Sequence, residues 1–314
     1  MTAPTGRRSA VAGIALALLA LPVALALVEA VSFSVRNRPS GTLRSSGLPR
    51  EYSLHVPASY HPDRPTPLVI SLHGAGLWGA AQREISRWNQ IAEREGLIVV
   101  YPSGIGAGSP RIWNMKGPDR SKDVRFISDL IDTLAAGYSI DRTRIYADGL
   151  SNGGGMAFIL SCALSDRIAA VGMVASAQLL PFTWCTSRVP VPMIAFHGTA
   201  DSVTPYHGGK TWIGPDPFHS IPVFTASWAR RNGCAGEPTE SVIAADVVRL
   251  EYPGCAETAA VVLYRIEGGG HSWPGGGPVP AWLVGRTSHS VEATNVMWEF
   301  FRRHPLVTRR ASRE

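Results

Sequence analysis

The segment RIYADGLSNGGG, residues Arg144–Gly155, joins an apolar run to a turn in which four glycines surround one serine. A buried strand that leads through Gly-X-Ser-X-Gly into a helix is typical of a turn that presents a nucleophilic serine above a sheet. Gly149 and Gly153 occupy the two positions where such a sharp turn leaves room only for hydrogen. Ser151 is then expected at a helix N-terminus, where the helix dipole favours developing negative charge. The alternative is a glycine-rich turn with an incidental serine.

Strand patterns and helix patterns alternate on both sides of this turn. Continuous apolar runs predict buried strands at residues 67–74, 96–102, 168–176, 191–198 and 260–269. EYSLHV, residues 51–56, predicts an edge strand. Apolar residues at helical spacing predict helices at residues 82–95, 124–137 and 293–300, the second closed by Gly137 as a C-terminal cap. This alternation predicts an α/β fold with a mostly parallel central sheet and helices on both faces.

A serine hydroxyl is a weak nucleophile and needs a base to take its proton. In an α/β hydrolase the acid and the histidine follow the serine along the chain in that order. His271 lies in the glycine-rich stretch EGGGHSWPGGG, after the last clearly buried strand, where a loop can bring an imidazole over the serine. His289 is the alternative base in the same part of the chain.

The acid is expected beyond a strand end, between the serine and the histidine. In PMIAFHGTADSVTPY, Asp201 follows the strand-ending His197 by four residues. Its carboxylate would accept the imidazole Nδ1–H, fix the tautomer and stabilise the imidazolium. Asp216 and Asp246 compete for this role without such a strand end before them, and a turn-forming aspartate is the alternative for Asp201.

A tetrahedral intermediate also needs backbone N–H donors for its oxyanion. One is expected to be the amide of Asn152, directly after the nucleophile. The other is assigned to Ala75, because His73-Gly74-Ala75 follows a buried strand and matches the HG type of oxyanion loop. His73 itself is expected to be structural.

Four cysteines, Cys162, Cys185, Cys234 and Cys255, are an even number that fits an oxidising compartment. Sequence alone allows three pairings, of which we prefer the local one, Cys162–Cys185 with Cys234–Cys255. The alternative is four buried free thiols. None of the cysteines shows C-x-x-C spacing, so no structural zinc is expected.

The two ends of the chain carry its excess positive charge. Arg7 and Arg8 precede an uncharged apolar run of about twenty residues, typical of an export signal or an uncleaved membrane anchor over residues 1–30. Residues 31–50 predict a linker, residues 51–303 a catalytic domain and residues 304–314 a basic tail. The formal net charge is +6, and residues 1–50 with 302–314 hold +9 of it, which leaves −3 on the body. A mildly acidic body is a poor phosphate-binding surface, so no nucleic-acid partner is expected.

Over residues 45–303, the combination of GLSNGG, HGTAD and GHSWPGG, together with LHGAG, YPSG and RNGC, resembles one family of secreted esterases. These are the polyhydroxybutyrate depolymerases of the short-chain-length type and the related feruloyl esterases of carbohydrate esterase family 1. The resemblance implies an α/β-hydrolase fold and a triad of Ser151, Asp201 and His271. It also implies the local disulfide pairing.

The resemblance further implies an exported serine esterase that acts through an acyl-enzyme, without metal or organic cofactor. Its substrates would be short hydroxyalkanoate esters or, alternatively, feruloyl or acetylxylan esters of plant walls. Trp113 and Trp273 would stack on an aromatic acyl group or a sugar, unless they are simply packed. Acyl transfer to a sugar would use the same residues, and a wall-polysaccharide binding module without turnover is the alternative of another class. Contact with a membrane is expected only through the N-terminal segment.

A histidine base makes a pH prediction. Esterase activity should rise as the base loses its proton, roughly through the range of an unperturbed histidine near 6.5. Initial rates on a p-nitrophenyl ester across pH 5 to 8, corrected for spontaneous hydrolysis, measure this. A flat profile over that range would count against a histidine base.

Overall fold

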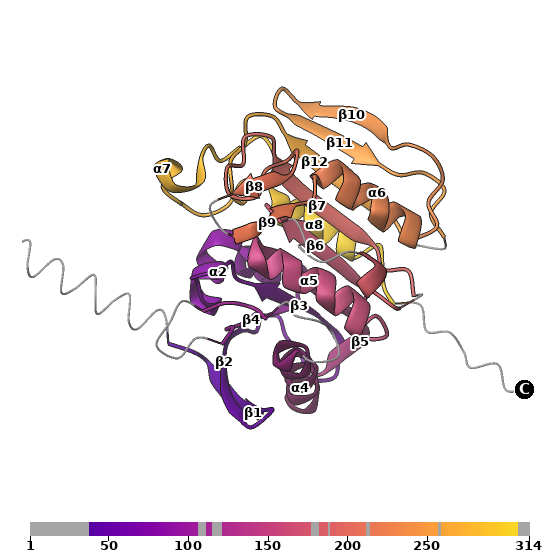
Figure 1. The fold of residues 1–314 in the computed structure, drawn as a ribbon. Coiled ribbons are helices and arrows are strands. Elements are labelled where there is room, and N and C mark those ends of the chain that lie inside the picture. The colour runs from indigo at the N-terminus through magenta and orange to yellow at the C-terminus, as the bar shows by residue number, and fades with distance from the viewer. Residues whose placement is uncertain are drawn as a thin grey trace, which may run out of the picture. The chain divides into compact units, whose positions relative to one another are not determined.

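A ten-stranded sheet runs through the unit Pro39–Glu314, one of the two units into which the chain divides; the other is Met1–Arg38 (Figure 1). The computed structural model describes residues 38–105, 111–114, 121–176, 182–187, 189–211, 214–256 and 259–306. The expected export signal or anchor and most of the basic tail lie outside these residues. Among the described residues, no helix is long and apolar enough to cross a membrane.

The strands of the sheet follow the order β1-β2-β4-β3-β5-β6-β7-β12-β11-β10. In that order they are Gly41–Ser45, Leu48–His55, Ile98–Pro102, Thr66–Leu72, Ile140–Leu150, Ala170–Val174, Met193–Gly198, Val261–Ile266, Val247–Glu251 and Thr239–Ala244. The strands from β4 to β12 pair in parallel, and the two strands at each end of the sheet pair antiparallel. A separate hairpin joins β8 (Gly209–Thr211) to β9 (Gly214–Phe218). The predicted mostly parallel sheet is therefore confirmed.

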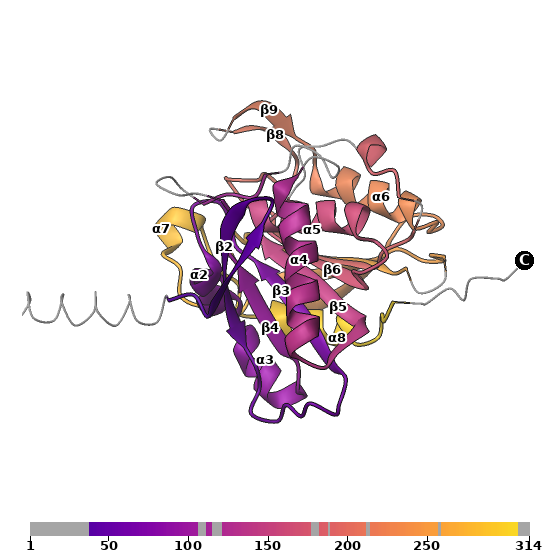
Figure 2. The ribbon, with the colours of Figure 1, turned by 90° about the horizontal axis from the view of Figure 1, so that it is seen from below.

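Helices cover both faces of the sheet (Figures 1 and 2). On one face lie α4 (Lys122–Gly137), α5 (Asn152–Ala163) and α6 (Ile221–Arg231); on the other lie α2 (Gly79–Ser86), α3 (Trp88–Glu95) and α8 (Ala293–Phe301). Short helices η1 (Phe182–Trp184) and α7 (Ala281–Val284) lie in connections. Side chains of the buried strands alternate between the two layers, as Ile70 and Val69 do on β3. The core is therefore split by the sheet into two apolar layers.

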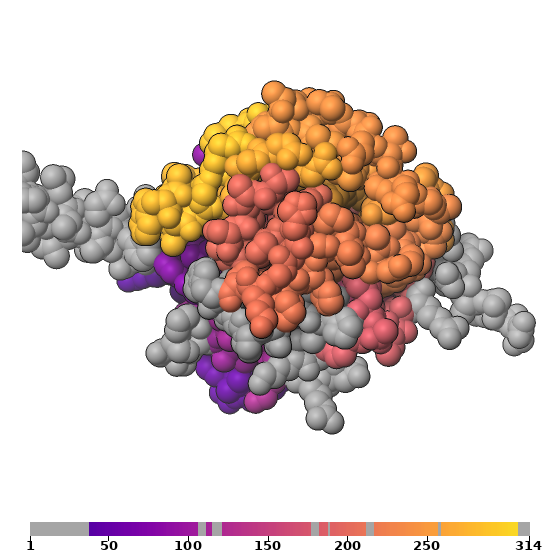
Figure 3. Space-filling model, turned by 45° about the horizontal axis from the view of Figure 1, so that its top comes forward, coloured from indigo at the N-terminus to yellow at the C-terminus, as the bar shows by residue number. Residues whose placement is uncertain are grey.

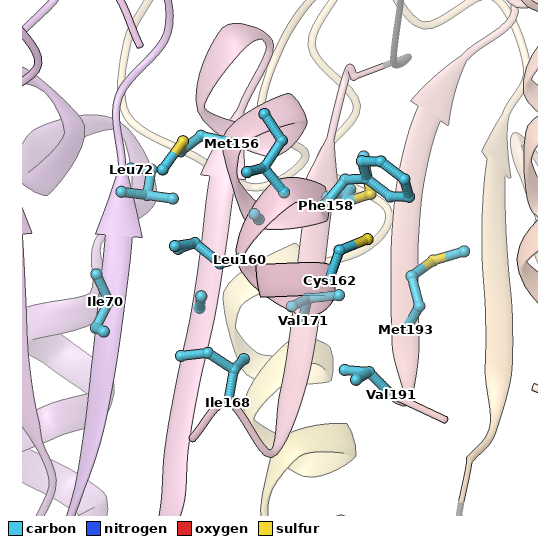
Figure 4. Packing of buried hydrophobic residues seen from close by; sticks show 14 of the residues in the cluster. Ile70, Leu72, Met156, Phe158, Leu160, Cys162, Ile168, Val171, Val191 and Met193 are labelled. Atoms are coloured by element: carbon cyan, nitrogen blue, oxygen red, sulfur yellow. The ribbon is translucent and has the colours of Figure 1, made fainter. Parts of the chain in front are cut away.

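The most deeply enclosed helix is α5, whose residues from Gly153 to Cys162 are all buried. Figure 4 shows Met156, Phe158 and Leu160 of this helix packed among strand residues that include Leu72 and Val171. A helix that is apolar all round must be covered all round. The position of α5 is consequently fixed by packing along its whole length.

Both disulfides join local partners. Cys162, at the end of α5, pairs with Cys185, and Cys234 pairs with Cys255 across 21 residues. The preferred pairing is confirmed. It leaves no free cysteine in the described part of the chain.

The linker prediction is wrong for its last ten residues. Gly41–Ser45 and Leu48–His55 form an antiparallel hairpin, so the strand predicted as an edge is covered by β1. The turn uses Ser46 and Gly47, both with positive φ, which is the two-residue hairpin geometry. The Ser, Gly and Arg residues that predicted a linker here belong to this hairpin.

Two helix predictions also need correction. The helix predicted at residues 82–95 is broken into α2 and α3 at Arg87, which has a φ of 57°. Gly137 is the last residue of α4 and Tyr138 caps the helix in an extended conformation, so Gly137 is not a left-handed cap. The apolar residues that predicted both helices are nevertheless buried as expected.

Arg50 ties the terminal hairpin to the helix layer. Its guanidinium donates to Asp123 of α4 at 2.6 Å and to the Ser103 carbonyl at 3.2 Å, and it lies 3.9 Å above the Phe126 ring. The side chains of Arg50 and Asp123 are only 3% and 0% exposed. Removing one partner of a buried ion pair leaves the other charge uncompensated.

We expect Arg50→Ala to lower the free energy of unfolding by about 3–5 kcal/mol. Arg44→Ala on the same hairpin is the matched control, because Arg44 is exposed and, within the described part of the chain, bonds only the Gly47 carbonyl. Denaturant unfolding followed by circular dichroism measures both. Equal, small effects of the two substitutions would contradict the importance assigned to the buried pair.

Candidate active site

The carboxyl ends of the parallel strands meet at one edge of the sheet, and the candidate residues follow them. Ser151 comes directly after β5, Asp201 three residues after β7 and His271 five residues after β12. The strands β5, β6, β7 and β12 are consecutive neighbours. Figure 3 shows the salmon-coloured segment after β7 lying beside the yellow segment nearer the C-terminus. Ligand sites of open α/β sheets lie at such an edge.

Ser151 has a strained backbone, with φ 54° and ψ −119°. Three close approaches explain the glycines around it. A Cβ on Gly149 would lie 2.3 Å from the Gly153 carbonyl carbon, one on Gly153 would lie 2.2 Å from the Leu72 carbonyl oxygen, and one on Gly154 would lie 2.5 Å from Ser176 Cβ. The turn is therefore compatible only with glycine at these positions. The prediction for Gly149 and Gly153 has a direct steric basis.

Hydrogen bonds to the next strand hold the serine backbone. The N–H of Ser151 donates to the Val174 carbonyl at 2.8 Å, and the hydroxyl of Ser176 donates to the Ser151 carbonyl at 2.8 Å. The N–H of Gly155 also donates to that carbonyl, at 3.1 Å. Both polar backbone groups of Ser151 are thus satisfied although its conformation is unusual.

Asp201 and His271 are joined directly. The His271 Nδ1–H donates to Asp201 Oδ2 at 2.8 Å, and Asp201 Oδ1 accepts the N–H groups of Val203 and Thr204, both at 2.8 Å. Burial alone would raise the pKa of Asp201, but the bond from His271, the adjacent imidazoles and the Thr204 amide outweigh it and lower the pKa. The carboxylate is therefore ionised at neutral pH. Because Nδ1 is engaged, Nε2 is the nitrogen of His271 left to act as a base.

Ser151 is connected to this pair through β6. Thr204 donates its hydroxyl proton to the Ala175 carbonyl at 3.0 Å or to Asp201 Oδ2 at 2.9 Å. Ala175 lies between Val174 and Ser176, the two residues that hold the Ser151 backbone. Among the described residues there is no direct hydrogen bond between Ser151 Oγ and the imidazole. In enzymes without substrate this bond is often loose and tightens on binding.

The two amides assigned to the oxyanion flank the serine. Asn152 opens α5, and a Cβ placed on Gly74 would lie 3.5 Å from Ser151 Cβ, so the loop with Ala75 lies beside Ser151. Neither the Asn152 nor the Ala75 N–H bonds another group in the described part of the chain. Both donors are therefore available to an oxyanion.

His73 is structural, as expected. Its ring is fully buried, Nε2 accepts the Gly104 N–H at 2.9 Å and Nδ1 donates to the Gly74 carbonyl at 2.7 Å. Burial lowers its pKa to about 4, so the ring is neutral at physiological pH. It fixes the loop that carries Ala75 against the residues after β4.

The predicted substrate contacts of Trp113 and Trp273 are corrected by their burial. The two side chains are only 2% and 1% exposed. The Trp113 indole donates to the His73 carbonyl at 2.9 Å, and the Trp273 indole donates to Thr294 Oγ1 at 2.9 Å. They lie in different apolar layers, on opposite faces of the sheet. The alternative, that both are packed, is the one observed.

Competing residues have other partners. Asp246 accepts from Arg286 and Ser288, both at 2.9 Å, and His289 is exposed. The side chain of Asp216 lies outside the described residues.

The sequence did not predict three further groups at this site. These are the side chains of Ser176, Thr204 and Asn152, and the Oδ1 atom of Asn152 accepts the Trp113 N–H at 2.7 Å. A signal existed for Thr204, since an aspartate followed three residues later by threonine is typical of a side chain–backbone turn. Across the described ranges, no group of three or more His, Cys, Asp or Glu is arranged to hold a metal ion.

A parallel sheet with helices on both faces, a serine on a strand–helix turn, and an acid and a histidine in that order after later strands define the α/β hydrolases. Residues 50–184 match the family described as esterase PHB depolymerase. The comparisons thereby support the resemblance found in the sequence, that of a polyhydroxybutyrate depolymerase- and feruloyl esterase-like α/β hydrolase.

Individual proteins agree with this placement. Feruloyl esterase B of Piromyces equi is 31% identical over 232 residues, which cover 71% of this chain but only 42% of that protein. Feruloyl esterase D of Neurospora crassa is 28% identical over 254 residues, covering 76% of this chain and 79% of that protein. The solved acetyl xylan esterase from Aspergillus awamori shares the fold with a TM-score of 0.60 at 13% identity, over 81% of this chain and 94% of that chain.

The steric basis of the turn predicts the effect of one methyl group. Gly153→Ala should abolish esterase activity and destabilise the fold by more than about 3 kcal/mol, because the new Cβ meets the Leu72 backbone. Gly137→Ala is the control: it lies at the end of α4 with no atom within 4 Å of its Cβ position, so stability should stay within about 1 kcal/mol. Thermal unfolding and p-nitrophenyl acetate turnover measure both, and an active, stable Gly153→Ala would refute the argument.

Proposed function

We propose that this protein is a serine esterase that hydrolyses carboxylic esters through Ser151, His271 and Asp201. The observation that carries the proposal is the bond of His271 to an ionised, fixed carboxylate at the sheet edge where the strained Ser151 lies. Serine, histidine and acid on neighbouring strand ends are the arrangement that activates a hydroxyl.

In this proposal each group has a distinct role. His271 Nε2 takes the Ser151 proton as the hydroxyl attacks the ester carbonyl, and the Asp201 carboxylate stabilises the imidazolium that forms. The amides of Asn152 and Ala75 stabilise the oxyanion of the tetrahedral intermediate. His271 then protonates the departing alcohol, and in the second half it activates the water that hydrolyses the acyl-enzyme.

The names of the relatives and of the matched family point to two classes of ester substrate. Feruloyl esterase B and feruloyl esterase D favour feruloyl esters of wall polysaccharide, and the acetylxylan esterase name among the relatives favours acetylated xylan. The matched family favours short hydroxyalkanoate esters. We place feruloyl esters first, because several relatives that this chain covers over 79% or more of their length carry the feruloyl esterase name. Two disulfides and the apolar N-terminal stretch support export from the cytoplasm.

Ser151→Ala in the purified full chain should reduce p-nitrophenyl acetate hydrolysis by about 10⁴-fold or more with the fold intact. Ser241→Ala, at an exposed position on β10, is the matched control and should leave the rate unchanged. Turnover of methyl ferulate, acetylated xylan and 3-hydroxybutyrate oligomers then ranks the substrate classes.

Other outcomes would identify the alternatives. Retention on xylan that survives Ser151→Ala, without ester turnover in the wild type, would support a binding module. Ester consumption that yields acylated sugar instead of free acid would support acyl transfer.

A further inference from the structure

Thr204 contacts both carboxylate oxygens of Asp201 and the Nδ1 atom of His271. Its N–H donates to Asp201 Oδ1 at 2.8 Å, and its hydroxyl lies 2.9 Å from Asp201 Oδ2 and 3.3 Å from His271 Nδ1. The same hydroxyl lies 3.0 Å from the Ala175 carbonyl, and the Thr204 carbonyl accepts His197 Nε2–H at 2.7 Å. The residue is buried. A group so placed influences the catalytic pair without meeting the substrate.

The proton count gives this hydroxyl a particular role. A threonine hydroxyl has one proton and lone pairs that accept. It faces two acceptors, the Asp201 carboxylate and the Ala175 carbonyl. Two ring nitrogens also approach it, His271 Nδ1 at 3.3 Å and His197 Nε2 at 3.5 Å, and the latter donates more closely to the Thr204 carbonyl. An ionised carboxylate is the stronger acceptor, so the proton goes chiefly to Asp201 Oδ2 and disperses part of its charge. The carboxylate oxygen that bonds the imidazole is therefore also the one that Thr204 holds.

The second acceptor links the pair to the nucleophile. Ala175 lies between the residue that accepts the Ser151 N–H and the residue whose hydroxyl donates to the Ser151 carbonyl. The Thr204 oxygen therefore lies 3.0 Å from the segment that holds the Ser151 backbone, while its proton is directed chiefly to Asp201 Oδ2.

His197 holds the backbone of Thr204 in place through the hydrogen bond to its carbonyl. It is fully enclosed at the end of β7, and burial lowers its pKa to about 4, so it acts as a neutral N–H donor over the working pH range. Asp201 and His197 are the titratable groups packed against His271 from β7. Arg286, on the segment after α7, is engaged with Asp246 and with backbone carbonyls after β12.

We propose that Thr204 is a positioning residue of the esterase: its hydroxyl orients the Asp201 carboxylate toward His271, moderates its charge and fixes the pair against the β6 segment that holds Ser151. The inference rests on the proposed function for its role in turnover, while its effect on Ser151 reactivity can be measured without a natural ester.

The test compares Thr204→Val, which keeps the shape and removes the hydroxyl, with Thr204→Ser, which keeps the hydroxyl. Thr204→Val should lower kcat on p-nitrophenyl acetate by about ten- to a hundredfold with KM nearly unchanged, because a hydrogen bond to a charged group is lost away from the substrate. Its acid limb of kcat/KM should move to higher pH, because an undispersed carboxylate charge holds the imidazolium more strongly. Thr204→Ser should restore both properties to near wild type.

A second measurement does not depend on ester turnover. The rate at which a fluorophosphonate modifies Ser151, followed by mass spectrometry across pH, should show the same loss and the same shift in Thr204→Val. If the wild type reacts with the probe but hydrolyses no ester, the proposed function fails while this comparison still tests Thr204. A wild type that the probe does not modify would overturn both.

Three results would overturn the inference alone. One is a Thr204→Val protein with wild-type rate and pH profile. Another is a Thr204→Ser protein as slow as Thr204→Val. The third is a lowered melting temperature and rate in Thr204→Val with the acid limb unmoved, which describes a purely structural role. If Thr204→Val does not fold, Thr204→Cys, with a similar volume and a weak S–H donor, takes its place in the same comparison.

Discussion

The backbone of Ser151 is the constraint around which the rest of the site is arranged. A residue other than glycine with φ of 54° and ψ of −119° occupies a sparsely populated region, at a cost on the order of 1–3 kcal/mol. The conformation persists because the neighbouring glycines allow β5, α5 and the chain after β3 to approach within contact distance. A relaxed backbone would turn the hydroxyl away from the edge where the acid and the histidine lie. The strain is therefore part of how the hydroxyl is presented.

The helix that follows the serine resists relaxation of that strain. Ten consecutive residues of α5 are buried against both the sheet and neighbouring helices (Figure 4). Its far end is fixed by the Cys162–Cys185 disulfide and by Arg231, which donates to the Ser161 hydroxyl at 2.9 Å and to its carbonyl at 2.6 Å. A helix fixed by packing and at its end cannot rotate or slide, so the turn at its start is over-determined.

The sequence predicted those parts of the fold that depend on a pattern of apolar residues. The buried strands β3, β4, β6, β7 and β12 lie where continuous apolar runs predicted them. The exposed strand β10 has no such run, and β1 lies in a segment whose Ser, Arg and Gly content matches a linker as well as a hairpin. The break of the helix at Arg87 depends on tertiary contacts, since no glycine or proline marks it.

The residues of the candidate site likewise fall into those that the sequence predicts and those that it does not. Ser151, Asp201 and His271 could be named because motif, strand end and chain order each leave a mark in the sequence. The burial of Trp113 and Trp273 could not be foreseen, because an indole near a site packs or binds according to what covers it. Thr204 and Ser176 make hydrogen bonds between strand ends, and such pairings depend on the register of β5, β6 and β7.

Burial distinguishes the candidate base from the other histidines at the strand ends. His73 and His197 lie at the ends of buried strands, but both are enclosed and burial lowers the pKa of each to about 4. Both nitrogens of His73, and Nε2 of His197, are bonded to backbone groups. Such rings donate or accept fixed hydrogen bonds and cannot take up a proton during a reaction at neutral pH. His271 lies at the rim on a glycine-rich loop, with one nitrogen on a carboxylate and the other uncommitted among the described residues. The same residue type therefore supplies two rigid supports and the proposed proton carrier, and the difference between them is set by how far each ring lies inside the protein.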